Sequence, residues 1–299
     1  MSNNKDRSKG FKEKNNTKLK SFKKLRVNSS DLEIKALTYI QRQEYDRAID
    51  VYQRLINQNT NNPIVYSNLG SLYWIKGNQK KAKILINKAL EIQAEYPEAL
   101  NNLGLIYKSE GNYKEAISLF EKAIGLNSNY HEAYNNLGST YFSEGKYEEA
   151  ITNFRNAIKL NSKFKDALVN LSKSLNNFGI QQKGKGLLMD SADSFKESIK
   201  ILNDYPDPYN NLGTVMSIKG NYEEAIKLFK TAIRINPKFS EAHYNLGNVY
   251  KRLNKFDLAI QAYKNTIQTN PSFYQALNNL GLLFKDLAKF ESSIEYLKR

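Results

Sequence analysis

The sequence predicts an all-α solenoid in which about eight pairs of antiparallel helices stack one after another. The first observation is a repeat of Asn-Leu-Gly, once Asn-Leu-Ser, whose third residues are Gly70, Gly104, Gly138, Ser172, Gly213, Gly247 and Gly281. The steps between them are 34, 34, 34, 41, 34 and 34 residues. The second observation is that apolar residues recur at spacings of three and four residues throughout the repeats, which is the spacing of one face of an α-helix. A fixed period of this size is typical of stacked repeats, in which each unit buries its apolar face against its neighbours.

Each repeat contains the pattern of two helices. In residues 97–130 the first helix is predicted from apolar or small residues at spacings of three and four, namely Leu100, Leu103, Gly104 and Tyr107. Gly111 and Asn112 end it. The second helix repeats that spacing with Ala116, Phe120 and Ala123, and Asn127 and Ser128 close the unit.

These pairs divide residues 29–299 into eight repeats: 29–62, 63–96, 97–130, 131–164, 165–205 with a seven-residue insertion, 206–239, 240–273 and an incomplete 274–299. We expect the insertion to lie between the two helices of the fifth repeat, in the region from Phe178 to Asp190. Its glycines, Gly179 to Gly186, resemble a phosphate-binding loop, but Gly186 stands where that loop has Ser or Thr, and no strand precedes it. A plain connecting loop is the favoured interpretation.

Small residues at two positions of the repeat predict close helix packing. Glycine at position eight lets the two helices of a pair approach, since a side chain there would overpack the contact by about 1–3 kcal/mol. Alanine at position twenty does the same for the second helix, as in Ala116. Tyrosine at position eleven, as in Tyr107, is expected to fill the core.

Composition restricts the class of protein. The 299 residues include no cysteine and two histidines, which excludes disulfides, thiolate metal sites and a cysteine nucleophile. No apolar run reaches the roughly 18 residues of a membrane span, and no signal-peptide segment follows the charged N-terminus. We therefore expect a cytoplasmic protein with no transmembrane segment.

The basic charge is concentrated at the N-terminus. Residues 1–28 carry ten Lys or Arg against Asp6 and Glu13, a net +8 of the chain's +15, and their composition predicts a disordered tail. Leu19, Phe22 and Leu25 are spaced by three among lysines, so the tail could form a basic amphipathic turn on an acidic surface. A tail that serves only solubility is the alternative.

Asparagine at position six of the repeat is the strongest candidate for function. It occupies seven successive repeats, as Asn68, Asn102, Asn136, Asn170, Asn211, Asn245 and Asn279. Position six lies about 200° around the helix from the packing glycine, so the side chain should face the surface. A carboxamide both donates and accepts hydrogen bonds, which matches the main chain of an extended peptide. The alternative is that these amides bond to one another or to solvent.

The same inner face carries variable residues at positions nine, twelve and thirteen. Those we expect to contribute to a groove are Trp74, Lys108, Phe142, Lys251 and Arg252. Because the main chain is common to all peptides, selectivity has to come from these flanking side chains. Partial burial against the first repeat is an equal alternative for Trp74.

Leu-Gly-x-x-Tyr followed by Ala-x-x-x-Phe at a 34-residue period resembles the tetratricopeptide repeat, over residues 29–299. That resemblance implies helix pairs wound into a right-handed superhelix with a concave groove. The copies of Asn-Asn-Leu-Gly and Phe-Glu-Lys-Ala-Ile are most similar to the repeat arrays of O-linked N-acetylglucosaminyltransferases and of bacterial glycosyltransferase or sulfotransferase fusions. In those arrays an inner asparagine ladder holds a peptide main chain, which supports the same role here.

The sequence therefore predicts a non-catalytic scaffold that binds an extended protein segment in its groove. We expect no catalytic residues, no metal site and no cofactor, because neither histidine has a carboxylate or serine partner that the repeat does not explain. One alternative is the substrate-recognition region of a transferase whose catalytic part, a possible partner, lies outside this chain. Another is weak association of residues 1–28 with nucleic acid or an anionic membrane surface.

Overall fold

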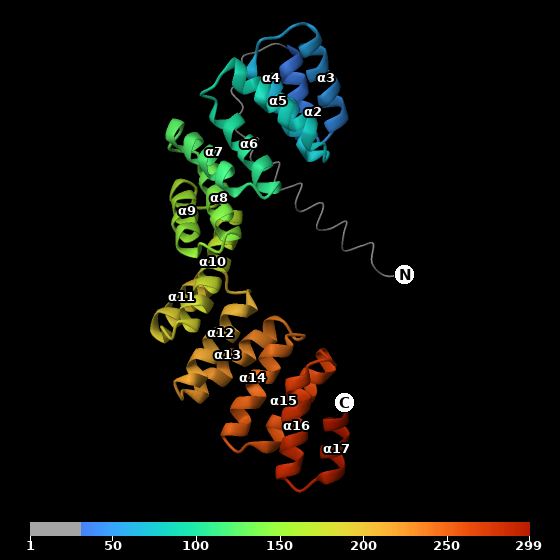
Figure 1. Cartoon of the computed structure of the whole chain (residues 1–299), viewed down its shortest axis with the longest axis vertical. Coiled ribbons are helices and arrows are strands. Elements are labelled where there is room, and N and C mark those ends of the chain that lie inside the picture. The colour runs from blue at the N-terminus through green and yellow to red at the C-terminus, as the bar shows by residue number, and fades with distance from the viewer. Residues whose placement is uncertain (1–30) are drawn as a thin grey trace. The chain divides into compact units, whose positions relative to one another are not determined.

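The computed structural model describes residues 31–299, so the predicted basic tail lies outside the described residues. The chain divides into two compact units, with the boundary between Ala167 and Leu168. Figure 1 shows each unit as a row of antiparallel helix pairs. All sixteen elements of the described part are α-helices, which confirms the prediction of an all-α array of about eight helix pairs.

Unit 1 contains four complete helix pairs. They are α2 (Asp31–Gln41) with α3 (Tyr45–Asn57), α4 (Pro63–Ile75) with α5 (Gln79–Ile92), α6 (Pro97–Ser109) with α7 (Tyr113–Leu126), and α8 (His131–Ser143) with α9 (Tyr147–Leu160). The proline that opens α4 or α6 occupies the first turn, where its missing N–H leaves no helical hydrogen bond unmade.

Unit 2 contains the other four pairs, and the unit boundary falls near the start of its first helix. They are α10 (Lys165–Gly184) with α11 (Leu188–Ile201), α12 (Pro206–Ile218) with α13 (Tyr222–Ile235), α14 (Ser240–Arg252) with α15 (Phe256–Thr269), and α16 (Tyr274–Asp286) with α17 (Phe290–Lys298).

The turn inside each pair requires a left-handed residue. Gly77, Gly111, Gly145, Gly186 and Gly220 have φ between 75° and 83°. At α6 the Gly111 N–H donates to the Lys108 carbonyl at 3.1 Å, and the Asn112 N–H donates to the Tyr107 carbonyl at 2.9 Å. These two bonds close the end of the first helix, and glycine adopts the required backbone without the strain of a Cβ.

Close approach of the two helices explains the other glycine of the repeat. A Cβ added to Gly104 would lie 2.7 Å from Phe120 Cε1, and one added to Gly247 would lie 2.7 Å from Tyr263 Cε1. Phe120 and Tyr263 are fully buried, so neither ring has room to move away. The predicted reason for glycine at position eight is confirmed, and the clashing group in each of these two pairs is the residue sixteen positions later.

The same test corrects the predicted position of the insertion. Gly179, not Ser172, is the packing glycine of the fifth repeat, because its Cβ would lie 2.7 Å from Phe195 Cε1. The helix α10 has 20 residues, whereas α6 and α12 have 13 each. The seven extra residues are therefore two additional helical turns, not a loop between helices. Gly179 and Gly184 are helical, which also removes the loop geometry that a phosphate-binding motif needs.

Ser172 has a packing role of its own. It is fully buried, and its Oγ lies 2.8 Å from Ser198 Oγ on α11. The Ser198 hydroxyl also donates to the Ser172 carbonyl at 2.7 Å. The two extra turns are thus anchored to the partner helix by polar contacts where other pairs use a glycine against a large side chain.

Substitution of each of the two α10 glycines by alanine tests which of them packs against α11. We expect Gly179→Ala to lower the free energy of unfolding by about 1–3 kcal/mol, because the new methyl group overlaps the buried Phe195 ring. Gly184→Ala is the matched control, since a Cβ there meets nothing within 4 Å. Chemical denaturation of both variants measures the difference. Equal stability of the two would contradict the assignment of Gly179 as the packing residue.

Candidate functional site

The first helices of successive repeats lie next to one another and form what we call the inner row. In unit 1 the inner row is α4, α6 and α8, and α6 contacts both of the others. In unit 2 it is the second half of α10 followed by α12, α14 and α16. Each unit has its own inner row, and positions six, nine and twelve of the repeat lie on it.

The position-six amides are tied across the inner row. Asn136 Nδ2 donates to Asn101 Oδ1 at 2.8 Å, and Asn245 Nδ2 donates to Asn210 Oδ1 at 2.9 Å. In the same way Asn211 donates to Asn176 at 2.9 Å, Asn102 to Ser71 Oγ at 2.9 Å, and Asn279 to Asn248 Oδ1 at 3.0 Å. Each bond joins neighbouring repeats, so the amides bond to other side chains, as the alternative interpretation held.

This bonding leaves part of each amide unused. An asparagine side chain has two donor hydrogens and an acceptor oxygen, and each bond uses one hydrogen of the position-six residue. Within residues 31–299 no protein group donates to the Oδ1 of Asn136 or Asn245, and both side chains are half-buried. These amides are consequently held in a fixed orientation while still offering an acceptor.

One of the seven predicted amides, Asn68, departs from this arrangement. Asn68 is 4% exposed and donates to the Tyr52 hydroxyl on α3 at 3.0 Å, so the expectation that it faces the surface is wrong. Burial raises the pKa of Tyr52 to about 12, which keeps the phenol protonated. Asn68 is therefore the amide that departs from the arrangement, whereas Asn170 lies half-buried in the first half of α10 and has an interaction partner.

The acceptors at position five are site residues that sequence reasoning missed. Asn101, Asn176 and Asn210 are at most 8% exposed, and each accepts from a position-six amide of the next repeat. The signal was present in the doublets Asn101-Asn102, Asn135-Asn136, Asn176-Asn177 and Asn210-Asn211. A buried asparagine needs a hydrogen-bond partner, and the following repeat supplies it.

The two predicted aromatic groove residues are partly packed. Trp74 is half-buried against the apolar cluster that includes Ala82, Ala99 and Ile106 of the second and third repeats. Phe142 makes an edge contact with Tyr147 of α9, with ring centroids 5.5 Å apart. Both rings are held by the scaffold and expose only part of their surface.

Two lysines at position twelve are desolvated. Lys108 Nζ donates to Ser139 Oγ on α8 at 2.6 Å, and burial lowers its pKa to about 8. Burial also lowers the pKa of Lys183, which stands four residues after Gly179 just as Lys108 stands four residues after Gly104. Lys183 was missed because the insertion was assigned to a loop.

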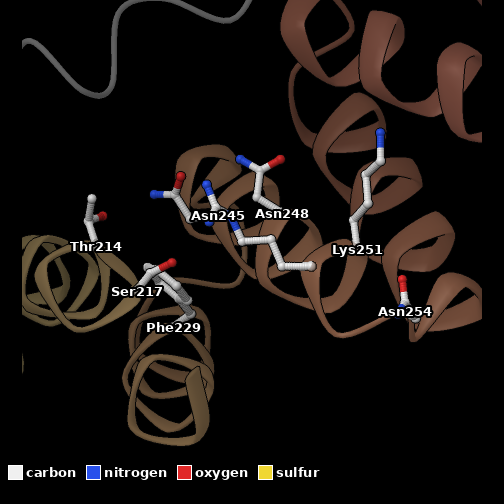
Figure 2. Close-up of a pocket in the computed structure, with 8 residues that line it drawn as sticks. Thr214, Ser217, Phe229, Asn245, Asn248, Lys251 and Asn254 are labelled. Carbon is white, nitrogen blue, oxygen red and sulfur yellow. The ribbon is translucent and has the colours of Figure 1, made fainter. Parts of the chain in front are cut away.

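An open pocket of about 530 Å3 lies on the inner row of unit 2. Figure 2 shows Asn245, Asn248 and Lys251 projecting from one side of α14 opposite Thr214 and Ser217. The predicted residues Lys251 and Arg252 both line it, and Lys251 Nζ lies 4.0 Å from Asp286 Oδ2. The structure thus brings Asn245, Lys251 and Arg252 together at one pocket, and their contact with a peptide stays a prediction.

Other kinds of site are not found in the described part of the chain. Among residues 31–299 no three His, Cys, Asp or Glu side chains gather where a metal ion could bind. None of the helices in that range is long and apolar enough to cross a membrane.

Comparison with known families decides the identity of the fold. Family models described as tetratricopeptide repeat match residues 97–130, 131–164 and 240–273, and also 64–96 and 274–299. A further model, described as TPR repeat, matches residues 36–77 and 218–254. Together these matches span residues 36–164 and 218–299, more than half of the chain. The chain belongs to the tetratricopeptide repeat family.

Two similar solved structures share this fold at a TM-score above 0.5. The C-terminal part of a TPR repeat-containing protein from Cytophaga hutchinsonii is 16% identical with a TM-score of 0.64, covering 82% of this chain and 98% of that one. PilF of Pseudomonas aeruginosa is 18% identical with a TM-score of 0.51, covering 76% and 96%. YrrB, a TPR protein with a peptide-binding site, is 21% identical with a TM-score of 0.49, covering 64% and 95%. No curated protein matches the chain.

A double-mutant cycle tests the bond between neighbouring amides. We expect Asn136→Ala to lower the free energy of unfolding by about 1–2 kcal/mol, because it leaves the buried Asn101 carbonyl without its donor. Once Asn101→Ala is present, Asn136→Ala should cost less by about 1 kcal/mol. Urea denaturation of the four proteins measures this coupling. Additive effects of the two substitutions would show that the bond contributes nothing to stability.

Proposed function

We propose that this tetratricopeptide repeat protein is a non-catalytic scaffold that binds an extended segment of a partner protein along its inner row. The observation that carries the proposal is the open pocket of unit 2, where the oriented amide of Asn245 stands beside Asn248, Lys251 and Arg252. An extended peptide presents C=O and N–H groups along its length, and a carboxamide complements both.

The bonding of the amides supports this role. Because Asn245 is already fixed by Asn210, little side-chain entropy is lost when its acceptor meets a peptide N–H. Asn136, fixed by Asn101, offers the same acceptor in unit 1. Preorganised groups of this kind favour binding mainly by reducing the cost of ordering.

The magnitude of these interactions limits the affinity. A hydrogen bond contributes about 0.5–1.5 kcal/mol net, and ordering a flexible peptide opposes it. A few amide contacts therefore give weak binding that tolerates many sequences. Variable side chains such as Ser217, Lys251 and Arg252 would supply the selectivity.

The alternatives drawn from the sequence have less support. The resemblance to the repeat arrays of glycosyltransferases and sulfotransferases finds no support in the comparisons. The tail, residues 1–28, lies outside the described residues, so its association with nucleic acid or an anionic membrane stays a hypothesis based on its charge. Transfer of a sugar or sulfate by the purified chain would contradict the non-catalytic role.

Filling the pocket tests the proposal. Peptides selected on the immobilised protein from a random displayed library would be synthesised and titrated against it by fluorescence anisotropy. We expect Ser217→Trp to weaken their binding at least about tenfold, because the indole occupies the pocket without removing any amide contact. Ser217 lies within α12, is half-buried, and its side chain makes no hydrogen bond within residues 31–299, so the melting temperature should change little.

Lys230→Trp on α13 is the matched control, since Lys230 is exposed and does not line the pocket. It should bind the selected peptides as the unsubstituted protein does. Unchanged binding by Ser217→Trp, or failure to select any peptide, would refute a peptide site in this pocket.

A further inference from the structure

Lys108 is a cation whose charge the protein does not balance. The only hydrogen-bond partner of its ammonium group in the described part of the chain is the Ser139 hydroxyl, and none of the ion pairs of unit 1 includes it. An ammonium group has three donor hydrogens, of which this contact uses one. Burial without a counterion disfavours the charged form, and desolvation is the cause of the low pKa, about 8.

The helices packed against α6 bring no charge that perturbs Lys108. Helix α4 contains no acidic or basic residue. The charged or titratable groups of the neighbours are Tyr66 and Tyr73 on α4, Lys80, Lys81, Lys83, Lys88 and Glu91 on α5, Tyr113, Lys114, Glu115, Glu121 and Lys122 on α7, and His131, Glu132, Tyr134 and Tyr141 on α8. None of them contributes to the shift. Glu110, on the turn after α6, pairs instead with Lys83.

In unit 2 Lys183 is also partly buried without a counterion. It occupies the equivalent position of α10, it is half-buried, and no carboxylate within residues 31–299 pairs with it. The charged residues of the neighbouring helices do not contribute to its lowered pKa. They are Asp190, Asp193, Lys196, Glu197 and Lys200 on α11 and Asp207 on α12. Lys251 at the equivalent position of α14 differs, because Asp286 lies 4.0 Å away.

A desolvated amine without a counterion gains most from a ligand that supplies one. A carboxylate would restore the charged form of the lysine and accept its unused hydrogens, which makes a strong charge-assisted bond. The group bonded to Lys108 is the neutral hydroxyl of Ser139, and the position-six amides of the same two helices, Asn102 and Asn136, are neutral as well. These surroundings fit a ligand that places one anionic group at Lys108 and neutral main-chain groups beside it. A peptide with an acidic side chain is such a ligand, whereas a nucleic acid carries a phosphate at every nucleotide.

We propose that Lys108 and Lys183 each receive an Asp or Glu side chain of the bound segment, so that the inner rows select acidic peptides. This inference rests on the proposed peptide-binding function and names the chemistry of its ligand. It also makes binding depend on pH in a defined direction. As the pH rises above 8 the free amine becomes neutral, so pairing with a carboxylate requires uptake of a proton and weakens.

A matched pair of peptides tests the selection. The probes are a fluorescein-labelled peptide of Glu, Ser and Gly, and its twin in which every Glu is Gln. At pH 7 we expect the Glu peptide to bind roughly ten- to a hundredfold more tightly than its twin. In the double variant Lys108→Met and Lys183→Met this preference should be lost, while binding of the Gln peptide is unchanged. Lys122→Met, an exposed lysine of α7, is the control and should keep the preference.

A pH series separates these two lysines from the general positive charge of the protein. For the unsubstituted chain the preference for Glu should fall by roughly tenfold per pH unit above 8. The double variant Lys108→Arg and Lys183→Arg should keep its preference up to pH 9.5, because guanidinium stays charged there. Circular dichroism of each variant confirms that it is folded.

Each outcome decides between the two proposals. Equal binding of the two peptides, or binding of neither at millimolar concentration, would overturn acidic selection, whereas the proposed peptide binding is overturned only if no peptide can be selected from the library. A preference that survives the double Met substitution would overturn the assignment to Lys108 and Lys183. A third probe, a single-stranded oligothymidylate, also overturns the proposal if it binds more tightly than the Glu peptide and loses affinity in the Met variant.

Discussion

The constraint on which the helix pair depends is the small size of position eight, which is glycine in seven pairs and Ala36 in the first. At Gly104 and Gly247 a single carbon atom would stand 2.7 Å from a buried aromatic ring of the partner helix. Such rings have low exposure and cannot rotate away, so the two helices keep their distance only with glycine between them. Because each pair sets the position of its first helix, this contact also fixes where the inner-row amides lie.

The inner row adds a second level of order, in which polar groups join repeat to repeat. Position-five asparagines are buried and accept from position-six asparagines of the next repeat. A buried amide without a partner would cost stability, so the bond couples neighbouring repeats as well as orienting the outer amide. The position-six asparagine is therefore part of the scaffold, and in the proposed function the same side chain contacts the peptide.

The sequence predicted most of this fold because its local signals agree. The period, the small residues and the turn glycines all indicated helix pairs, and the clash at Gly104 confirmed the stated reason for glycine. The fifth repeat was misassigned because Asn170, Leu171 and Ser172 imitate the usual triplet seven residues too early. The seven-residue step from Gly179 to Gly186, which equals that from Gly104 to Gly111, marks the true register.

The bonds of the candidate site could not be predicted from the sequence. The bond from Asn136 to Asn101 joins residues 35 positions apart, so it depends on how neighbouring repeats are packed, which the sequence of one repeat does not show. Burial of Lys108 was equally invisible, because surroundings and not residue type determine it.

The lengthening of α10 shows how a repeat array tolerates insertions. Seven residues turn an ideal helix through about 700°, only about 20° short of two full revolutions, and lengthen it by about 10.5 Å. Residues beyond such an insertion return almost to their former azimuth, so Gly179 still meets Phe195 and Asn176 still meets Asn211. Insertion of five residues would have rotated the same groups to the opposite side. A heptad is thus a length by which one helix of an array can grow while every downstream contact keeps its direction.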